Sequence, residues 1–221
     1  MFAMKQLVDF FVLAGRLKKI KRRGALLYGK TEDEVESTAE HSYRMSLMSW
    51  ILAEKKGGLD IARVLKMSLV HDLCEAYAGD LTPYDGLLPK CEKERYDFVR
   101  TWPGLSKEER EKRFKEKHER EKKGLERLVS RLNEKLRRDI MDLWLDYEAC
   151  NSQEAKFVKQ IDRIENLLQA EEYYEEDSEF PTKPWWMHAR EAVDDPLSLE
   201  FMDALEDREM KVRGMRGDID V

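Results

Sequence analysis

Apolar residues recur at spacings of three and four positions through most of the 221-residue chain, and this helical period constrains the fold more than any other feature. One such stripe, within residues 3–20, consists of Leu7, Phe10, Phe11, Ala14 and Leu17. Residues that favour strands and turns are scarce, because Val, Ile and Thr together number 23, Gly 11 and Pro 6. An all-β fold is therefore excluded, and the sequence predicts an all-α protein.

The same period predicts helices along the rest of the chain. These are expected over residues 39–56, 60–77, 137–149, 152–176 and 197–211, with two charge-rich amphipathic helices inside 91–136 on either side of Trp102-Pro103-Gly104. Two glycines and two prolines within residues 79–89 predict a long ordered loop there. Since we find no internal repeat and no long linker, we predict a single-domain helical bundle over residues 1–221.

Charge and cysteine content limit the compartment and the partners. With 40 basic and 46 acidic residues, the net charge of −6 provides no general attraction to nucleic acid or to anionic membranes. No apolar run approaches 18 residues, and the N-terminal stretch contains Asp9 and lacks a small-residue cleavage site, so neither a membrane span nor a signal peptide is predicted. The three cysteines form no CxxC pair, which favours a reducing compartment. We expect a cytoplasmic protein that binds neither nucleic-acid polymers nor membranes.

Two of the four histidines stand where a site could be built. His41 opens the predicted helix 39–56, and His71 lies near the end of the helix 60–77, directly before Asp72. His118 lies in the charged run KEKHEREKK and is predicted to face solvent. His188 follows Trp185-Trp186, and we expect these aromatic residues to serve packing or an interface.

Four segments together carry a family pattern. They are Leu17 to Arg22, Glu36-Ser37-Thr38-Ala39-Glu40-His41-Ser42, Val70 to Leu81, and Glu154-Ala155-Lys156-Phe157-Val158-Lys159-Gln160-Ile161-Asp162. In order and spacing they resemble the HD-domain metal-dependent phosphohydrolases, and within that superfamily the 5′-deoxynucleotidase branch. The resemblance implies an HD-type helical bundle with a metal-site core over residues 4–176, and it fades in residues 177–221, which we expect to form a C-terminal helical extension.

The resemblance implies that His41, His71, Asp72 and Asp162 hold one divalent cation. Imidazoles and carboxylates without a thiolate suit Mn²⁺, Co²⁺, Fe²⁺, Ni²⁺ or Mg²⁺, and the sequence leaves the identity open. Such a cation can lower the pKa of water and neutralise charge on phosphoryl oxygens. For Asp162, which lies between Lys159 and Arg163, an ordinary surface ion pair is the alternative. Glu165, one turn further on, is expected to be solvated or to support the site.

Three more residues match positions that the family uses for catalysis and for phosphate binding. Glu75 follows His71 by four residues, so on a continuous helix it would project from the same face. Asp80 comes directly after Gly79, beyond the helix end. The resemblance implies that one carboxylate activates the attacking water and the other assists the leaving 5′-oxygen, without assigning which. Arg22 matches the phosphate-binding arginine, whose planar fork suits phosphate, although a basic residue at a helix end also stabilises the helix dipole.

The resemblance therefore predicts a homodimeric enzyme that hydrolyses nucleoside 5′-monophosphates to nucleoside and phosphate and prefers 2′-deoxyribonucleotides. Arg22 is followed by Arg23, where some bacterial members carry tryptophan, so base and sugar selection stay open. Another small phosphoester is an alternative substrate. Two-metal phosphodiesterases use extra histidines, which this chain lacks between His71 and His118, and triphosphohydrolases are generally longer. A nucleotide-sensing module without turnover is the alternative from a different class, and an intact Glu75 and Asp80 argue against it.

Overall fold

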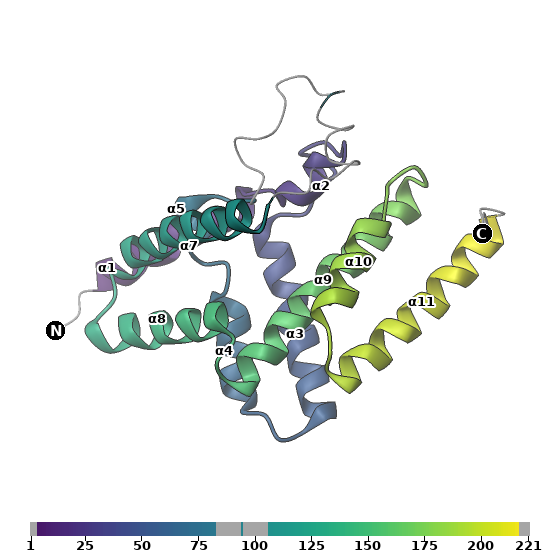
Figure 1. Ribbon diagram of the computed structural model, residues 1–221. Coiled ribbons are helices and arrows are strands. Elements are labelled where there is room, and N and C mark those ends of the chain that lie inside the picture. Colours follow the sequence, from purple (N-terminus) through teal and green to yellow (C-terminus); the bar gives the residue numbers. More distant parts are fainter. Residues whose placement is uncertain (1–3, 83–93, 95–105, 217–221) are drawn as a thin grey trace. The chain divides into compact units, whose positions relative to one another are not determined.

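The computed structural model describes residues 4–82, 94 and 106–216 (Figure 1). Within these residues the regular structure is helical, and the one β-type contact is an isolated antiparallel bridge between Lys21 and Ser37. The predicted all-α fold class is confirmed. The chain forms two compact units, one from residues 1–43 and 69–146 and the other from residues 44–68 and 147–221. The prediction of a single domain over residues 1–221 stays a prediction.

The first unit contains short helices near the N-terminus and two long helices. Its elements are α1 (Met4–Ala14), the 3₁₀ helix η1 (Gly15–Lys19), α2 (Arg23–Leu27), the start of α3 (Thr38–Lys56), the end of α4 (Ile61–Val70), α5 (Glu75–Ala78), α7 (Lys107–Val129) and α8 (Glu134–Ala149) as far as Asp146. Helix α7 packs against both α1 and α5 (Figure 1). The hydrophobic core of this unit includes Phe10, Leu125, Leu128 and Trp144. Packing these side chains together removes their apolar surface from water.

The second unit is built around α9 (Gln153–Glu176), with the remaining parts of α3, α4 and α8. Helices α10 (Lys183–Ala192) and α11 (Pro196–Arg216) both pack on α9 (Figure 1). Trp186 Nε1 donates a 2.6 Å hydrogen bond to Glu171 of α9, and the Trp185 ring lies 5.2 Å from that of Phe180. These two tryptophans therefore serve packing inside the unit.

Two helices that the periodicity predicts as continuous are interrupted. The predicted helix 3–20 is α-helical only to Ala14 and continues as the 3₁₀ helix η1. The predicted helix 60–77 ends at Val70 and resumes at Glu75. Between them the amide of Glu75 donates to the carbonyl of Asp72 at 3.0 Å, an i to i+3 bond that tightens the chain into a turn. The expectation of one continuous helix carrying His71 and Glu75 is wrong.

Other differences concern short or proline-flanked helices. The five-residue helix α2, which contains Gly24, is not among the helices predicted from periodicity. Helix α10 was not predicted because of nearby prolines, yet Pro184 occupies its first turn, where a missing N–H costs little. The predicted last helix extends to residues 196–216 as α11. Of the predicted loop 79–89 and the first charged helix of 91–136, most residues lie outside the described part of the chain.

The charged helix α7 corrects the expectation for His118. Its ring stacks on that of Trp144, with the centroids 5.0 Å apart, and the side chain is half-buried. Trp144 itself is almost fully buried, so His118 closes one side of the apolar core instead of facing solvent.

None of the helices in the described ranges has the length and apolar character that crossing a bilayer requires.

Candidate metal centre

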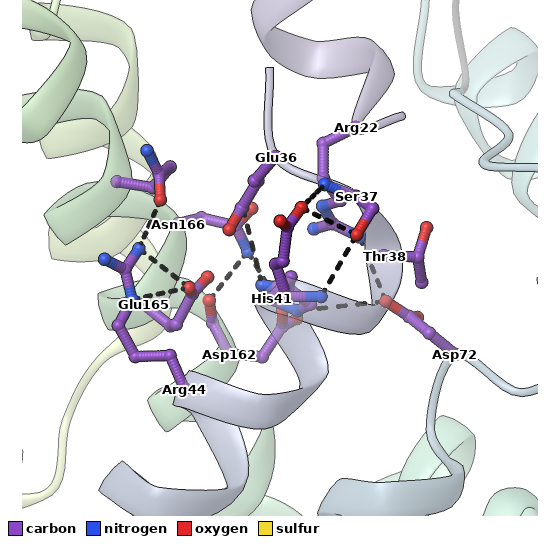
Figure 2. Close-up of polar contacts among 12 residues, drawn as sticks. Arg22, Glu36, Ser37, Thr38, His41, Arg44, Asp72, Asp162, Glu165 and Asn166 are labelled. Atoms are coloured by element: carbon purple, nitrogen blue, oxygen red, sulfur yellow. Dashed lines mark hydrogen bonds and ion pairs between the residues drawn. The ribbon is translucent and has the colours of Figure 1, made fainter. Parts of the chain in front are cut away.

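The first turn of α3 is held by a reciprocal pair of side chains. Glu40 Oε2 accepts hydrogen bonds from the Ser37 amide at 2.6 Å and the Ser37 hydroxyl at 2.7 Å, while the Glu40 amide donates to Ser37 Oγ at 3.3 Å. This is a capping box, the arrangement that the pattern S-x-x-E typically forms. It fixes the helix start, so Thr38 and His41, three residues apart, lie on one side of the first turn (Figure 2).

A backbone contact brings Arg22 to the same turn. The Arg22 amide donates to the carbonyl of Glu36 at 3.1 Å, and the Thr38 amide donates to the carbonyl of Ile20 at 2.8 Å. These two bonds join segments about 16 residues apart and place the Arg22 side chain beside the start of α3. Helix periodicity alone does not predict such a contact.

His41 and His71 face each other in the interior of the first unit. Their Nε2 atoms are 3.3 Å apart, and both side chains are buried. Asp72 Oδ2 lies 3.1 Å from Nε2 of His71 and 3.8 Å from Nε2 of His41. On the other side of the His41 ring, Nδ1 faces Glu36 Oε1 at 4.0 Å (Figure 2). The structure thus brings together three of the four predicted metal ligands.

This arrangement fits a divalent cation. Two imidazole nitrogens that bind one ion at about 2.0–2.1 Å lie about 3 Å apart when their bonds are near a right angle. Both Nε2 atoms lie within 3.8 Å of one oxygen of the adjacent Asp72 carboxylate, which is anionic. Burial raises the pKa of Asp72, but His71, Arg22 and His41 together outweigh burial and hold that pKa well below its usual range. The donors are two nitrogens and one charged oxygen, without sulfur.

Glu75 lies beside these ligands in a different electrostatic setting. It is buried, and Thr38 Oγ1 donates a 2.7 Å hydrogen bond to its Oε2. Arg22 Nη1 is 2.9 Å from Asp72 Oδ2 and 3.9 Å from Glu75 Oε1. Burial, followed by the negative charges of Asp72 and Asp80, raises the pKa of Glu75 well above its usual value, against the opposing effects of Arg22 and Thr38. A carboxyl group with a raised pKa in such a site suits proton transfer near neutral pH.

Asp80 contacts the main chain of the segment that carries Arg22. Its Oδ2 accepts a 2.7 Å hydrogen bond from the amide of Arg23, the first residue of α2. Gly79 directly before it has a φ of 74°, in the left-handed region that glycine adopts without strain. The glycine thus allows the chain to turn back after α5, so that Asp80 holds the segment carrying Arg22.

Asp162 belongs to the second unit, on α9. Its side chain is buried, Tyr147 donates a 3.0 Å hydrogen bond to Oδ2, and Asn166 donates a 2.9 Å bond to Oδ1. The guanidinium of Arg163 does lie 4.0 Å from Oδ2, but Asp162 is buried and accepts these two hydrogen bonds as well, so it is more than an ordinary surface ion pair. Glu165 is also fully buried and accepts a 2.9 Å hydrogen bond from Arg44 Nε, so it is not solvated (Figure 2).

Several of these partners were not among the predicted site residues. Thr38 and Glu36 lie inside a segment quoted for its family pattern, and Asn166 follows Asp162 by one helical turn, so their positions were visible as sequence neighbours of predicted ligands. Tyr147 and Arg44 carried no such signal. Their contacts with α9 depend on how other helices pack against it, since Tyr147 lies on the preceding helix α8 and Arg44 on the distant helix α3.

His41 and His71 are buried beside Asp72 in a helical fold, and comparison with known proteins identifies the family. The model of the HD domain family matches residues 14–190, and the chain belongs to this family. Curated relatives include the proteins named 5′-deoxynucleotidase HDDC2 in Mus musculus, 34% identical, and in Xenopus laevis, 35% identical. The matches cover 76% and 78% of this chain, and 69% and 72% of the relatives.

Solved structures agree with this assignment. A conserved hypothetical protein from Pyrococcus furiosus is 26% identical with a TM-score of 0.62, and the match covers 90% of this chain and 97% of that one. A protein from Magnetospirillum magnetotacticum, described as a predicted metal-dependent phosphohydrolase, is 25% identical with a TM-score of 0.63, covering 96% and 97% of the two chains. The predicted HD-type fold is confirmed.

Proposed function

We propose that this protein is a metal-dependent phosphomonoesterase that hydrolyses nucleoside 5′-monophosphates to nucleoside and phosphate, with a preference for 2′-deoxyribonucleotides. The observation that carries the proposal is the buried pair of facing imidazoles, His41 and His71, beside the anionic Asp72. The substrate class is supported by relatives named 5′-deoxynucleotidase in animals, in Dictyostelium discoideum and in yeasts. Free nucleotides, not nucleic-acid polymers or membranes, are the proposed partners.

We propose that His41, His71, Asp72 and Asp162 hold one divalent cation, of the group Mn²⁺, Co²⁺, Fe²⁺, Ni²⁺ and Mg²⁺. The geometry of the first three ligands and the buried, hydrogen-bonded state of Asp162 support this set. When bound, the cation lowers the pKa of water and stabilises negative charge on the phosphoryl oxygens.

Arg22 is proposed to bind the substrate phosphate. Its guanidinium lies at the carboxylates of Asp72 and Glu75, and it is mostly buried there. The planar fork of arginine forms two parallel hydrogen bonds with a phosphate group, which orients the group as well as attracting it. The backbone bonds around Ile20 and Glu36, together with the Asp80 contact to Arg23, hold this arginine in place.

Glu75 is proposed to accept the proton from the attacking water, and Asp80 to assist proton transfer to the leaving 5′-oxygen. The raised pKa of Glu75 supports its role, because a general base works best when its pKa lies near the working pH. The hydroxyl of Thr38 orients the Glu75 carboxyl group. For Asp80 the support is its place after Gly79, at the segment that carries Arg22.

Phosphate release tests the proposal. Chelator-stripped protein is reloaded in turn with Mn²⁺, Co²⁺ and Mg²⁺ and given matched ribo- and deoxyribonucleoside 5′- and 3′-monophosphates. Metal-dependent release confined to 5′-deoxyribonucleotides is the expected result, and release from both sugars removes the deoxy preference. His71→Ala and Asp72→Ala are expected to lose metal and activity together. No release from metal-loaded protein contradicts the proposal and favours another phosphoester or a nucleotide-sensing module.

We also propose that the protein is a cytoplasmic homodimer. Cys74 and Cys150 are free thiols, which suits a reducing compartment. One face of α3 exposes the apolar side chains of Leu47, Trp50 and Ile51. An exposed apolar stripe of this kind is typical of association surfaces. Light scattering measures the molar mass of the wild type, expected to be a dimer, and of Trp50→Glu, expected to be a monomer. A monomeric wild type contradicts the proposal.

A further inference from the structure

We infer that Tyr147 and Asn166 are positioning residues for Asp162, and that by holding both oxygens of its carboxylate they set the affinity of the site for its divalent cation. The inference rests on the proposed function, in which Asp162 is a ligand. All three residues lie in the second unit. Neither Tyr147 nor Asn166 belongs to the predicted site.

Each oxygen of the Asp162 carboxylate has its own donor. The Tyr147 hydroxyl donates to Oδ2 at 3.0 Å, and Asn166 Nδ2 donates to Oδ1 at 2.9 Å. The same Asn166 amide donates to the main-chain carbonyl of Asp162 at 2.7 Å. Rotation of the Asp162 carboxylate would break one or both of these side-chain bonds. The bond from Asn166 to the main-chain carbonyl of Asp162 ties the Asn166 side chain to α9.

Both donors are themselves held in place. Asn166 lies one turn after Asp162 on α9, and side chains four residues apart are neighbours on a helix. Tyr147 is buried, and the ammonium group of Lys159 lies 4.0 Å from the centre of its ring. That ammonium group also contacts Glu148 Oε1 at 3.2 Å, so its position over the ring is fixed from a second side. These contacts hold both donors in the positions from which they bond to Asp162.

The hydrogen bonds from Tyr147 and Asn166 leave the Asp162 carboxylate able to bind a cation. Each carboxylate oxygen has two lone pairs, so the bond from Tyr147 or Asn166 uses only part of the acceptor capacity of its oxygen. The guanidinium of Arg163 also lies 4.0 Å from Oδ2. A ligand that is already oriented loses little conformational freedom on binding. Partners that orient metal ligands typically change metal affinity or activity about 10- to 100-fold when they are removed. Tyr147 and Asn166 have the contacts that this role requires.

The test measures metal binding and stability in addition to activity. Dissociation constants for Mn²⁺ are determined by competition with a chromophoric chelator for wild type, Tyr147→Phe, Asn166→Leu and the double variant. Tyr147→Phe removes a single oxygen atom, and Asn166→Leu replaces the amide by an apolar group of similar size. Tyr173→Phe is the matched control, because Tyr173 is also buried on α9 but lies about 16 Å along the helix from Asp162.

We expect each single variant to bind Mn²⁺ about 10-fold more weakly, the double variant about 100-fold more weakly, and Tyr173→Phe to bind as wild type does. Saturating Mn²⁺ is expected to restore most of the turnover in the single variants. Wild-type affinity in both Tyr147→Phe and Asn166→Leu overturns the inference while leaving the proposed function intact. Equal losses in Tyr173→Phe also overturn it, because they indicate a general effect on folding. A wild-type protein that binds no metal overturns the proposed function itself.

Discussion

Asp72 and Glu75 are three residues apart in the chain but differ in how easily they ionise. Asp72 meets two imidazoles and the Arg22 guanidinium, and these contacts outweigh burial and lower its pKa. Glu75 is more deeply buried than Asp72, and this burial raises its pKa, with the negative charges of Asp72 and Asp80 adding to the effect. These opposite pKa shifts agree with the proposed roles, in which Asp72 holds a cation and Glu75 moves a proton.

The first prediction concerns Glu75→Gln. The amide cannot accept a proton but keeps the shape of the side chain, so we expect near-normal Mn²⁺ affinity and a kcat at least about 100-fold lower. In the wild type the base must be deprotonated to act. Because its pKa is raised, kcat/KM should increase with pH through a pKa above 4.5, the ordinary value for glutamate, and this limb should disappear in the variant.

Steady-state kinetics from pH 5 to about pH 9, with Mn²⁺ saturation checked at each pH, measures both effects. The control is Glu34→Gln, because Glu34 is exposed, accepts hydrogen bonds from Thr31 and is not one of the proposed site residues. An unchanged acidic limb in Glu75→Gln would assign the titration to another group.

At the scale of elements, the break between α4 and α5 carries Asp72 and ends at Glu75, two of the proposed site residues. The turn at residues 71–74 replaces the predicted continuous helix, and helix α7 packs directly against α5. Gly124 of α7 stands at this contact. A methyl group added there would lie 2.8 Å from the carbonyl oxygen of Cys74 and 3.4 Å from the amide of Ala78. Only a residue without a side chain lets these helices approach so closely.

Gly124→Ala is therefore expected to destabilise the protein. Overpacking costs about 1–3 kcal/mol, and the better helix propensity of alanine offsets about 1 kcal/mol of this. The shifted Cys74 backbone adjoins Asp72 and Glu75, so kcat should fall as well. Urea unfolding measures the stability. Gly15→Ala is the control, because a methyl group there meets nothing within 4 Å, and equal destabilisation in both variants would contradict the packing argument.

At the scale of the whole molecule, cation binding should contribute to thermal stability. The site's donors are assembled by folding, so a cation binds the folded protein in preference to the unfolded chain. At 100 times the dissociation constant this linkage stabilises a protein by about 2.7 kcal/mol. For a chain of this size, that corresponds to about 5–10 °C in Tm.

We predict that chelation lowers Tm by this amount, that Mn²⁺ restores it, and that His71→Ala shows no response to either treatment. Scanning calorimetry in the presence and absence of EDTA makes the measurement. A full response in His71→Ala would place the stabilising cation elsewhere, because that variant lacks one of the two facing imidazoles.

The amino-acid sequence alone determined the all-α class, most helix positions and the identity of the ligand candidates. Helices 39–56 and 152–176 were predicted within one residue of α3 and α9, because amphipathic periodicity is a local property. The His71-Asp72 pair was visible for a similar reason, since adjacent residues with metal-binding side chains need no fold to be recognised.

Only the tertiary structure decided how these residues meet. The 3.3 Å approach of His41 to His71 and the hydrogen bond from Thr38 to Glu75 join positions 30 or more residues apart. The helix break at His71 lies beside α5, which packs against α7. The donors on Asp162 likewise come partly from another helix. Helical periodicity records which residues face inward, whereas distances and pKa values depend on which buried groups become neighbours, and that is set by the packing of the helices.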